Sequence, residues 1–474
     1  MNKPHLIVII TLFILSSFQN PVFAQNNGEG PIYIVQPGEN LSNIAQKFGV
    51  DVNDLISINR IVNSNIISAG TQLIIPGLEG ISGILSVTPI QLGETIPVIL
   101  QKYQVSMEVL LKLNKITSPS EVYVGTNLIL PVSNLEVPEP LNSLFTVDKD
   151  SSILMDSIKK GIQHWPVTIS SQKSITSIQI PKEPLNLMTE FDDPGESNGS
   201  IFSPYIQNIE LKPLPFSQGH TLVFKIFHSK PLKLIGNFDG QSLEFYQDTS
   251  SQMQYALDSV YALRDPGLAE FSLKGTFDSG ESFVVDQMIL IESGGFTNET
   301  LTVESTLIDE ELNITESAKV QEILATTTSD RYWSGTFRYP VDGSLEDDTI
   351  GFSSFFGNRR SYNNGEYFGF HGGLDFYVLL NSFNVYAPAP GVIAFAGPMD
   401  IRGLTTFIDH GQGVFSGYAH LSEILVEEGQ FVNEGELIGL IGKTGRVTGP
   451  HLHWDIWVNG KQVDPFDWVY TQYP

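Results

Sequence analysis

The spacing of apolar and polar residues changes twice along the chain, and each pattern predicts a different structure. Between residues 31 and 131, apolar positions recur with the spacing of one helix face, flanked by short apolar runs. From about residue 146 to 300, short runs alternate apolar and polar residues, as half-buried strands do. Beyond residue 335, short strand-like runs are punctuated by glycines. The pattern therefore predicts a mixed multidomain chain in which helical modules precede two β domains.

The N-terminal part contains an internal duplication. Residues 31–76 align without gaps with residues 86–131. Every matched pair has the same spacing, and the pairs include Gly38 and Gly93, Phe48 and Tyr103, Asn59 and Asn114, Gly70 and Gly125, and Pro76 and Pro131. Each copy reads strand, helix, helix, strand, so we expect two small βααβ modules.

The first copy shows the helical spacing most clearly. Ile44, Ala45 and Phe48 would share one face of its first helix, and Ser42 is expected to cap the helix N-terminus. In the second copy, Pro97 falls in the first turn of the equivalent helix. Proline is tolerated there because the first-turn N–H has no partner within the helix. The same fold is therefore expected for both copies.

The middle of the chain is expected to be all β. Turn sequences such as NFDG at 237–240 separate its alternating runs, and strands at this spacing predict a β-sandwich of immunoglobulin-like character. Residues 316–325 predict a short connecting helix. His164, His220 and His228 lie in this part without carboxylates at ligand spacing, so we interpret them as ordinary core or surface histidines.

Five of the nine histidines lie at or beyond His371. His371 and Asp375 flank a Gly-Gly pair that lets the backbone turn both side chains toward one point, and imidazole plus carboxylate is a normal pair of zinc ligands. Such a pair alone is a weak signal. His420 ends a second alternating run, in GYAHLSEI.

The stretch TGPHLHWDI places two more histidines on one face of a predicted strand. Successive side chains of a strand point to opposite faces, so His451, His453 and Asp455 would share one face. Each would be about 6.5 Å along the strand from the next. Leu452 and Trp454 would lie on the other. Buried histidines without partners are costly, so two on one face favour a shared anion, metal or reacting group.

Composition limits the partners and the metal ligands that this chain can have. The chain has 26 basic and 53 acidic residues and a net charge of −27, which argues against nucleic-acid partners. It has no cysteine, so any metal must be held by His, Asp or Glu. Residues 1–24 have the layout of a secretory signal peptide, with an uncleaved anchor as the alternative. No later run reaches the roughly 18 apolar residues of a membrane span, so we expect an exported protein without an integral span.

The duplicated modules resemble the LysM carbohydrate-binding module. The resemblance rests on the G-E-x-L-x-x-I-A-x-x-F-x-V run, a central Asn and the G-x-x-L-x-I-P ending. It implies binding to glycan that contains N-acetylglucosamine, most plausibly peptidoglycan. The glycan-binding candidates are Gly38, Asn59, Gly93 and Asn114. A βααβ module that binds nothing is the alternative.

Residues 335–469 resemble the lysostaphin-type (LytM-like) zinc endopeptidases, which cut peptidoglycan cross-links. The matching motifs are His-x-x-x-Asp at 371–375, Tyr-x-His-Leu around 420, and Gly-Pro-His-Leu-His at 449–453. The resemblance implies one zinc per chain, with His371, Asp375 and His453 as the ligands. It makes His420 and His451 the catalytic histidines and leaves His410 structural.

Together these features predict a secreted, cell-wall-associated zinc endopeptidase that acts on peptidoglycan cross-links and is held on glycan strands. A catalytically inactive wall-binding scaffold or amidase activator is the alternative. The run LVEEGQFVNEGELIGLIGKTG also suits a lipoyl or biotinyl carrier, but that interpretation leaves the histidines unexplained. The expected domains are a signal peptide (1–24), LysM-like modules (31–77 and 84–132), a linker (133–145), a β-sandwich with a helical connector (146–330) and an all-β peptidase domain of β-roll or barrel-sandwich type (335–470).

Overall fold

The computed structural model describes much of the chain beyond residue 29. The described residues are 30–36, 39–63, 67–116, 122–132, 202–248, 251–301, 310–325, 328–344, 349–363, 365, 367–377 and 382–474. The predicted signal peptide and linker, Gly38 and His164 lie outside these ranges. Within the described residues, no helix has the length and apolar character needed to cross a membrane.

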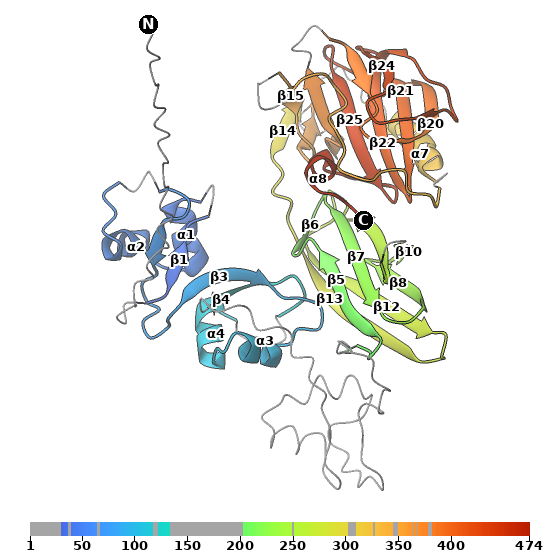
Figure 1. Cartoon of the computed structure of the whole chain (residues 1–474). Coiled ribbons are helices and arrows are strands. Elements are labelled where there is room, and N and C mark those ends of the chain that lie inside the picture. Colours follow the sequence, from blue (N-terminus) through green and yellow to red (C-terminus); the bar gives the residue numbers. More distant parts are fainter. Residues whose placement is uncertain are drawn as a thin grey trace, which may run out of the picture. The chain divides into compact units, whose positions relative to one another are not determined.

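The chain separates into two compact units, the first made of residues 1–86, 105–115 and 129–136 and the second of 87–104, 116–128 and 137–474. The two predicted modules each have the order strand, helix, helix, strand (Figure 1). Their elements are β1 (Ile32–Ile34), α1 (Leu41–Phe48), α2 (Val52–Ile58), β2 (Gln72–Ile74), β3 (Ile84–Pro89), α3 (Ile96–Lys102), α4 (Met107–Asn114) and β4 (Asn127–Val132). The βααβ expectation is confirmed for both copies.

The predicted cap of the first helix is wrong by two residues. Asn40, not Ser42, is the N-cap of α1, and its side-chain oxygen accepts a hydrogen bond from the backbone N–H of Asn43. Both residue types cap helices, and Asn40 stands where the backbone is still extended. Ile44, Ala45 and Phe48 are buried on one face of α1, as predicted.

The middle of the chain forms two sheets around one core (Figure 1). One has the order β10-β11-β7-β5, and the other has the order β6-β13-β12-β8-β9. Phe216, Phe224 and Phe271 lie in their shared core. An immunoglobulin-like identity for this region stays a prediction. The strands are β5 (Ile206–Lys212), β6 (Phe216–Ser217), β7 (Thr221–His228), β8 (Leu232–Phe238), β9 (Gln241–Leu243), β10 (Tyr246–Gln247), β11 (Met253–Ser259), β12 (Gly267–Phe277) and β13 (Ser282–Glu292).

The C-terminal region is built on a ten-stranded sheet whose main path runs β15-β18-β25-β22-β21-β20-β23. Its strands are β15 (Gly351–Ser354), β18 (Leu374–Tyr377), β19 (Asn384–Tyr386), β20 (Gly391–Met399), β21 (Gly403–Gly411), β22 (Val414–Ile424), β23 (Phe431–Val432), β24 (Leu437–Ile441), β25 (Leu452–Val458) and β26 (Lys461–Val463). A small second sheet joins β14 (Asn298–Leu301), β16 (Arg359–Tyr362) and β17 (Tyr367–Phe370). The strands β25, β22 and β21 lie side by side at the centre of the large sheet (Figure 1).

Two helices accompany this sheet, so the expectation of an all-β domain over residues 335–470 needs correction to mostly β. Helix α8 (Pro465–Tyr470) falls inside that range because Asp464 caps its N-terminus and Pro465 occupies the first helical position. The predicted connector is the longer helix α7 (Glu310–Leu324), which lies beside β20 (Figure 1).

The strand β25 alternates between two environments, as its sequence predicts. Leu452, Trp454 and Ile456 are buried in the main hydrophobic core, which also contains Tyr418 and Leu374. His453 and Asp455 therefore point to the opposite face of the sheet. Packing of the apolar face in the core therefore fixes the position of the strand whose opposite face carries His453 and Asp455.

Candidate metal centre

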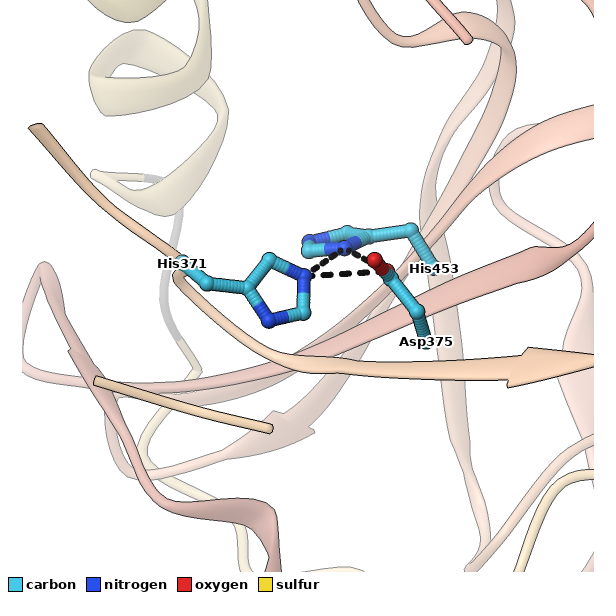
Figure 2. A group of neighbouring side chains, drawn as sticks. All are labelled: His371, Asp375 and His453. Carbon is cyan, nitrogen blue, oxygen red and sulfur yellow. Dashed lines mark hydrogen bonds and ion pairs between the residues drawn. The ribbon is translucent and has the colours of Figure 1, made fainter. Parts of the chain in front are cut away.

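Strand pairing brings three metal-binding side chains to one point. In the antiparallel pair β18–β25, Asp375 lies directly opposite His453. His371 stands in the turn that leads into β18 and is buried. Figure 2 shows the three side chains converging, with His371 and Asp375 approaching from one segment and His453 from another. Residues far apart in sequence thus form one cluster.

The Gly-Gly pair between the first two side chains is required by the closeness of the neighbouring strand. A Cβ at Gly373 would lie 2.2 Å from the backbone oxygen of Trp454 on β25. A Cβ at Gly372 would meet the side chain of Gln462 at 2.0 Å. Glycine at position 373 therefore lets this turn pack against the backbone of β25, and the turn places His371 beside Asp375 as expected from the sequence.

The donor atoms of the cluster face one another. His371 Nε2 lies 2.9 Å from Asp375 Oδ1 and 3.1 Å from His453 Nδ1. The third distance, between His453 Nδ1 and Asp375 Oδ1, is 2.8 Å. Each residue contributes one ligand atom, so the set is two imidazole nitrogens and one carboxylate oxygen.

This cluster fits zinc. Ligands at about 2.0–2.1 Å around a tetrahedral Zn²⁺ are about 3.3 Å apart, so an opening of a few tenths of an ångström would admit the ion. The far nitrogen of His371, Nδ1, donates to the backbone oxygen of Phe355 at 2.8 Å, which leaves Nε2 with its lone pair toward the cluster. His453 Nε2 lies 3.4 Å from Asp455 Oδ2 in the same way. Zinc-binding histidines are oriented by partners of this kind.

His420 and His451, the two predicted catalytic histidines, make the same kind of hydrogen bond. His420 Nδ1 donates to the backbone oxygen of Thr444 at 2.9 Å, and His451 Nδ1 donates to that of Gly449 at 2.9 Å. In each ring Nδ1 keeps its proton and donates it in a hydrogen bond to a carbonyl, so Nε2 is the acceptor in the neutral ring. His451 Nε2 lies 3.8 Å from Asp375 Oδ1, and the two rings are 4.9 Å apart between centroids. Both histidines therefore flank the cluster.

His420 sits in an unusual backbone conformation. Its φ is +65°, in the left-handed region that a non-glycine residue adopts only under local constraint. Its backbone N–H donates to the oxygen of Arg402 at 2.8 Å, and its ring is tied to Thr444. The chain turns at this residue, and both bonds hold the ring toward the cleft.

The electrostatics favour neutral rings for His371 and His420 beside an ionised Asp375. Burial opposes protonation of His453, but its hydrogen bonds to Asp375 and Asp455 outweigh burial and raise that pKa. Burial raises the pKa of Asp375, but His371 and His453 outweigh it and hold that pKa well below its usual range. Burial lowers the pKa of His371. Burial, with His453 and His451 nearby, lowers the pKa of His420 to about 3. The deprotonated groups are those that a metal and a proton acceptor require.

The cluster opens into a cleft of about 1010 Å³. Its lining includes His451, next to β25, and Arg360 on β16 of the small sheet. Helix α7 contributes Glu316, and the β11–β12 connection contributes Tyr261 and Leu263. An extended substrate could therefore contact groups outside the sheet that carries the histidines.

The remaining predicted site residues take other positions. Asn59 donates to the backbone oxygens of Leu55 and Ile74 at 2.9 and 2.8 Å and accepts from the N–H of Ile74 at 2.7 Å. Asn114 makes the equivalent three bonds in the second module, with Leu110 and Ile129. These amides join the second helix to the closing strand of each module.

The side-chain amides of both asparagines are thus hydrogen-bonded to backbone groups of their own modules. A glycan contact by either asparagine stays a prediction, as it does for Gly93, whose φ is +81°. His410 is buried between Pro390 and Ser416, away from the cluster's donor atoms. His220 pairs with Asp467 at 2.9 Å, a partner that its local sequence does not contain.

Sequence reasoning missed the groups that support the cluster. Arg402 donates to the buried carboxylate of Asp455 at 2.6 Å, and Glu316 accepts from the backbone N–H groups of Ile401 and Arg402. Asp455 shares the predicted polar face of β25, which was a usable signal. Nothing in the local sequence links Glu316 or Arg402 to residues so far along the chain.

Comparisons with known proteins follow the same division of the chain. Residues 369–465 match the model of Peptidase family M23, and residues 33–76 and 90–131 match the LysM domain. Peptidoglycan DD-endopeptidase ShyA of Vibrio cholerae is 39% identical over 127 residues, which are 27% of this chain and 28% of that protein. DD-carboxypeptidase/endopeptidase Mpg of Neisseria meningitidis is 45% identical over 95 residues, 20% of this chain and 22% of that protein.

The matched stretches thus span about a quarter of the length of these two relatives. Among solved structures, the catalytic domain of lysostaphin from Staphylococcus simulans matches with 25% identity and a TM-score of 0.20, covering 32% of this chain and 98% of that one.

Proposed function

We propose, for a chain that carries a Peptidase family M23 domain and two LysM domains, that it is an exported zinc-dependent endopeptidase. Its substrates would be the peptide cross-links of bacterial peptidoglycan. The observation that carries the proposal is the convergence of His371, Asp375 and His453 beside two histidines with free Nε2 atoms. Relatives named as peptidoglycan DD-endopeptidases support the substrate class.

In this proposal His371, Asp375 and His453 hold the zinc. When bound, zinc supplies a Lewis acid that polarises the scissile carbonyl and makes a water molecule acidic enough to deprotonate near neutral pH. His420 and His451 supply the proton transfers. In the neutral form of each ring Nε2 is the acceptor nitrogen, so either ring can accept a proton from water and pass one to the leaving amine. The Nδ1 bonds to backbone keep both rings in the required tautomer.

The LysM domains would hold the enzyme on glycan strands. Linking a binding module to a catalytic domain raises the effective concentration of cross-links near the cleft. The net charge of −27 gives no attraction to anionic polymers, so hydrogen bonds and apolar contacts would provide the grip. A cell-wall location after export is part of the same proposal.

The decisive experiment incubates purified zinc-loaded protein with purified peptidoglycan and identifies new termini by mass analysis. We expect new amine and carboxyl termini at the cross-link, their loss on chelation, and their return when zinc is restored. The matched control is His451→Ala at equal zinc content. Zinc-bound protein that binds peptidoglycan but releases no new termini would contradict the proposal and favour the non-catalytic scaffold.

A further inference from the structure

Helix α7 carries a buried carboxylate on an otherwise apolar face. Its buried residues are Glu316, Val320 and Leu324, spaced four apart along one stripe of the helix. Val320 and Leu324 pack with Phe407 and Trp457 on the large sheet. A glutamate in such a stripe loses its hydration, so it requires compensating hydrogen bonds.

The compensating bonds come from one turn of the backbone. Glu316 Oε2 accepts from the N–H of Ile401 at 2.6 Å, and Oε1 accepts from the N–H of Arg402 at 3.0 Å. A second bond joins α7 to the 443–446 loop, because Asn313 Oδ1 accepts from Arg446 Nη1 at 3.2 Å. The helix lies outside the stretch that matches Peptidase family M23, yet its carboxylate fixes the turn before β21.

Arg402 in that turn makes two contacts that lead to the cleft, one through its backbone and one through its side chain. The backbone oxygen of Arg402 accepts from the N–H of His420, the residue with a φ of +65°. The guanidinium of Arg402 donates through Nη2 to Asp455 Oδ2 at 2.6 Å and stacks over Phe407 and Trp457. Asp455 is fully buried and lies behind His453 at 3.4 Å. One residue thus anchors a candidate catalytic histidine by its backbone and a candidate metal ligand through its side chain.

We propose that Glu316 and Arg402 are positioning residues, through which helix α7 sets the geometry of the metal centre and of His420. The route runs from Glu316 to the 401–402 backbone, then to His420 through a peptide bond oxygen and to His453 through Asp455. This inference rests on the proposed function, since it assumes that His371, Asp375 and His453 hold zinc. It assigns a role in the metal centre to a helix outside the matched domain.

The test measures zinc affinity by competition with a chromogenic chelator. It uses the whole chain after residue 24, the end of the predicted signal peptide. For Glu316→Ala we expect about a 10-fold weaker zinc affinity and a similar fall in kcat with KM little changed, as for loss of an outer partner of a metal site. Glu316→Gln keeps one acceptor oxygen and should fall between. Glu322, exposed on the same helix, provides the matched control Glu322→Ala, which should leave zinc affinity and kcat unchanged.

Arg402→Met separates the two branches of the route. It removes the guanidinium but keeps the backbone oxygen that holds His420. Zinc affinity should fall by about 10- to 100-fold. Adding Glu316→Ala should then lower zinc affinity little further, because both changes act on affinity through the same side chain.

Two results would overturn the inference. One is a Glu316→Ala protein whose melting temperature falls while zinc affinity and kcat match those of Glu322→Ala, which would make Glu316 merely structural. The other is full additivity of the two changes in zinc affinity. Because chelator competition needs no substrate, it decides this inference even if the wild type cleaves no peptidoglycan, in which case only the proposed function fails.

Discussion

His410 differs from His420 and His451 in how many of its ring nitrogens are hydrogen-bonded. His410 is fully buried, with Nδ1 bonded to the oxygen of Pro390 at 2.8 Å and Nε2 bonded to Ser416 Oγ at 2.7 Å. His420 and His451 line the cleft, and each has only its Nδ1 bonded to a backbone carbonyl. Burial alone therefore does not distinguish a structural histidine from a reactive one; the free second nitrogen does.

The pKa values of His410 and His420 do not separate the two kinds of histidine, because both are lowered. Burial lowers the pKa of His410 to about 4, and burial is also the largest cause of the lowered pKa of His420. Both rings are neutral at pH 7, but only His420 can exchange a proton with a bound molecule. Substitutions in the two groups should consequently separate zinc binding, catalysis and stability.

The largest effect is expected for His453→Ala, which removes a ligand atom from the centre of the cluster. Zinc affinity should fall by more than about 100-fold, because loss of a ligand exceeds the 10- to 100-fold typical of an outer partner. Peptidoglycan cleavage should disappear with it. Metal analysis of the purified protein checks the prediction, and a variant that keeps one zinc per chain would exclude His453 as a ligand.

His451→Ala should remove catalysis while sparing the metal. We expect kcat to fall by about 10²–10⁴-fold, the usual contribution of a general acid or base, with zinc content unchanged. Cleavage assays at matched zinc occupancy provide the measurement. If zinc is lost together with activity, the roles of His451 and His453 are assigned the wrong way round.

His410→Ala should show the opposite balance. It leaves a cavity and removes the hydrogen bonds to the Pro390 oxygen and to Ser416 Oγ, whose hydroxyl keeps Tyr418 as a partner. Together these losses cost about 3 kcal/mol of unfolding free energy. Zinc content and kcat, measured well below the melting temperature, should stay within about threefold of wild type. Urea or thermal unfolding gives the stability change, and a loss of zinc without a loss of stability would be the contrary outcome.

The smallest effect concerns His220, outside the cleft. Asp467 raises the pKa of His220 despite the opposing effect of burial, so the folded pKa lies above the unfolded value of about 6.5. The ion pair therefore stabilises the fold fully below about pH 6.5, and this stability is lost as pH rises through the folded pKa. The ring is a third exposed, so about 1 kcal/mol or less is expected.

The measurement is the melting temperature of His220→Gln against wild type at pH 5.5 and pH 9. The destabilisation should be larger at the lower pH. His228→Gln is the contrasting control, because burial lowers the pKa of His228 and its substitution should be most favourable at low pH. A difference for His220→Gln that does not change with pH would mean that the pair is not an ion pair.

The sequence predicted local features well where a short motif fixes the geometry. The alternation in TGPHLHWDI gave both faces of β25, and the Gly-Gly pair gave the turn at His371. The resemblances drawn from the motifs are confirmed by the matches to Peptidase family M23 and LysM. The errors concern boundaries: Asn40 replaced Ser42 as a cap, and Asp464 with Pro465 formed a helix in a domain expected to be all β.

By itself, then, the sequence determined the repeated βααβ modules, the strand carrying His451 and His453, and the identity of the residues that could bind zinc. These features depend on spacing within a few residues. Only the tertiary structure paired Asp375 with His453, gave His220 its carboxylate, and set Glu316 of α7 against the turn that holds Arg402. Such contacts join segments far apart in the chain, and they form because burying a charge or a polar ring requires a partner, wherever in the sequence that partner lies.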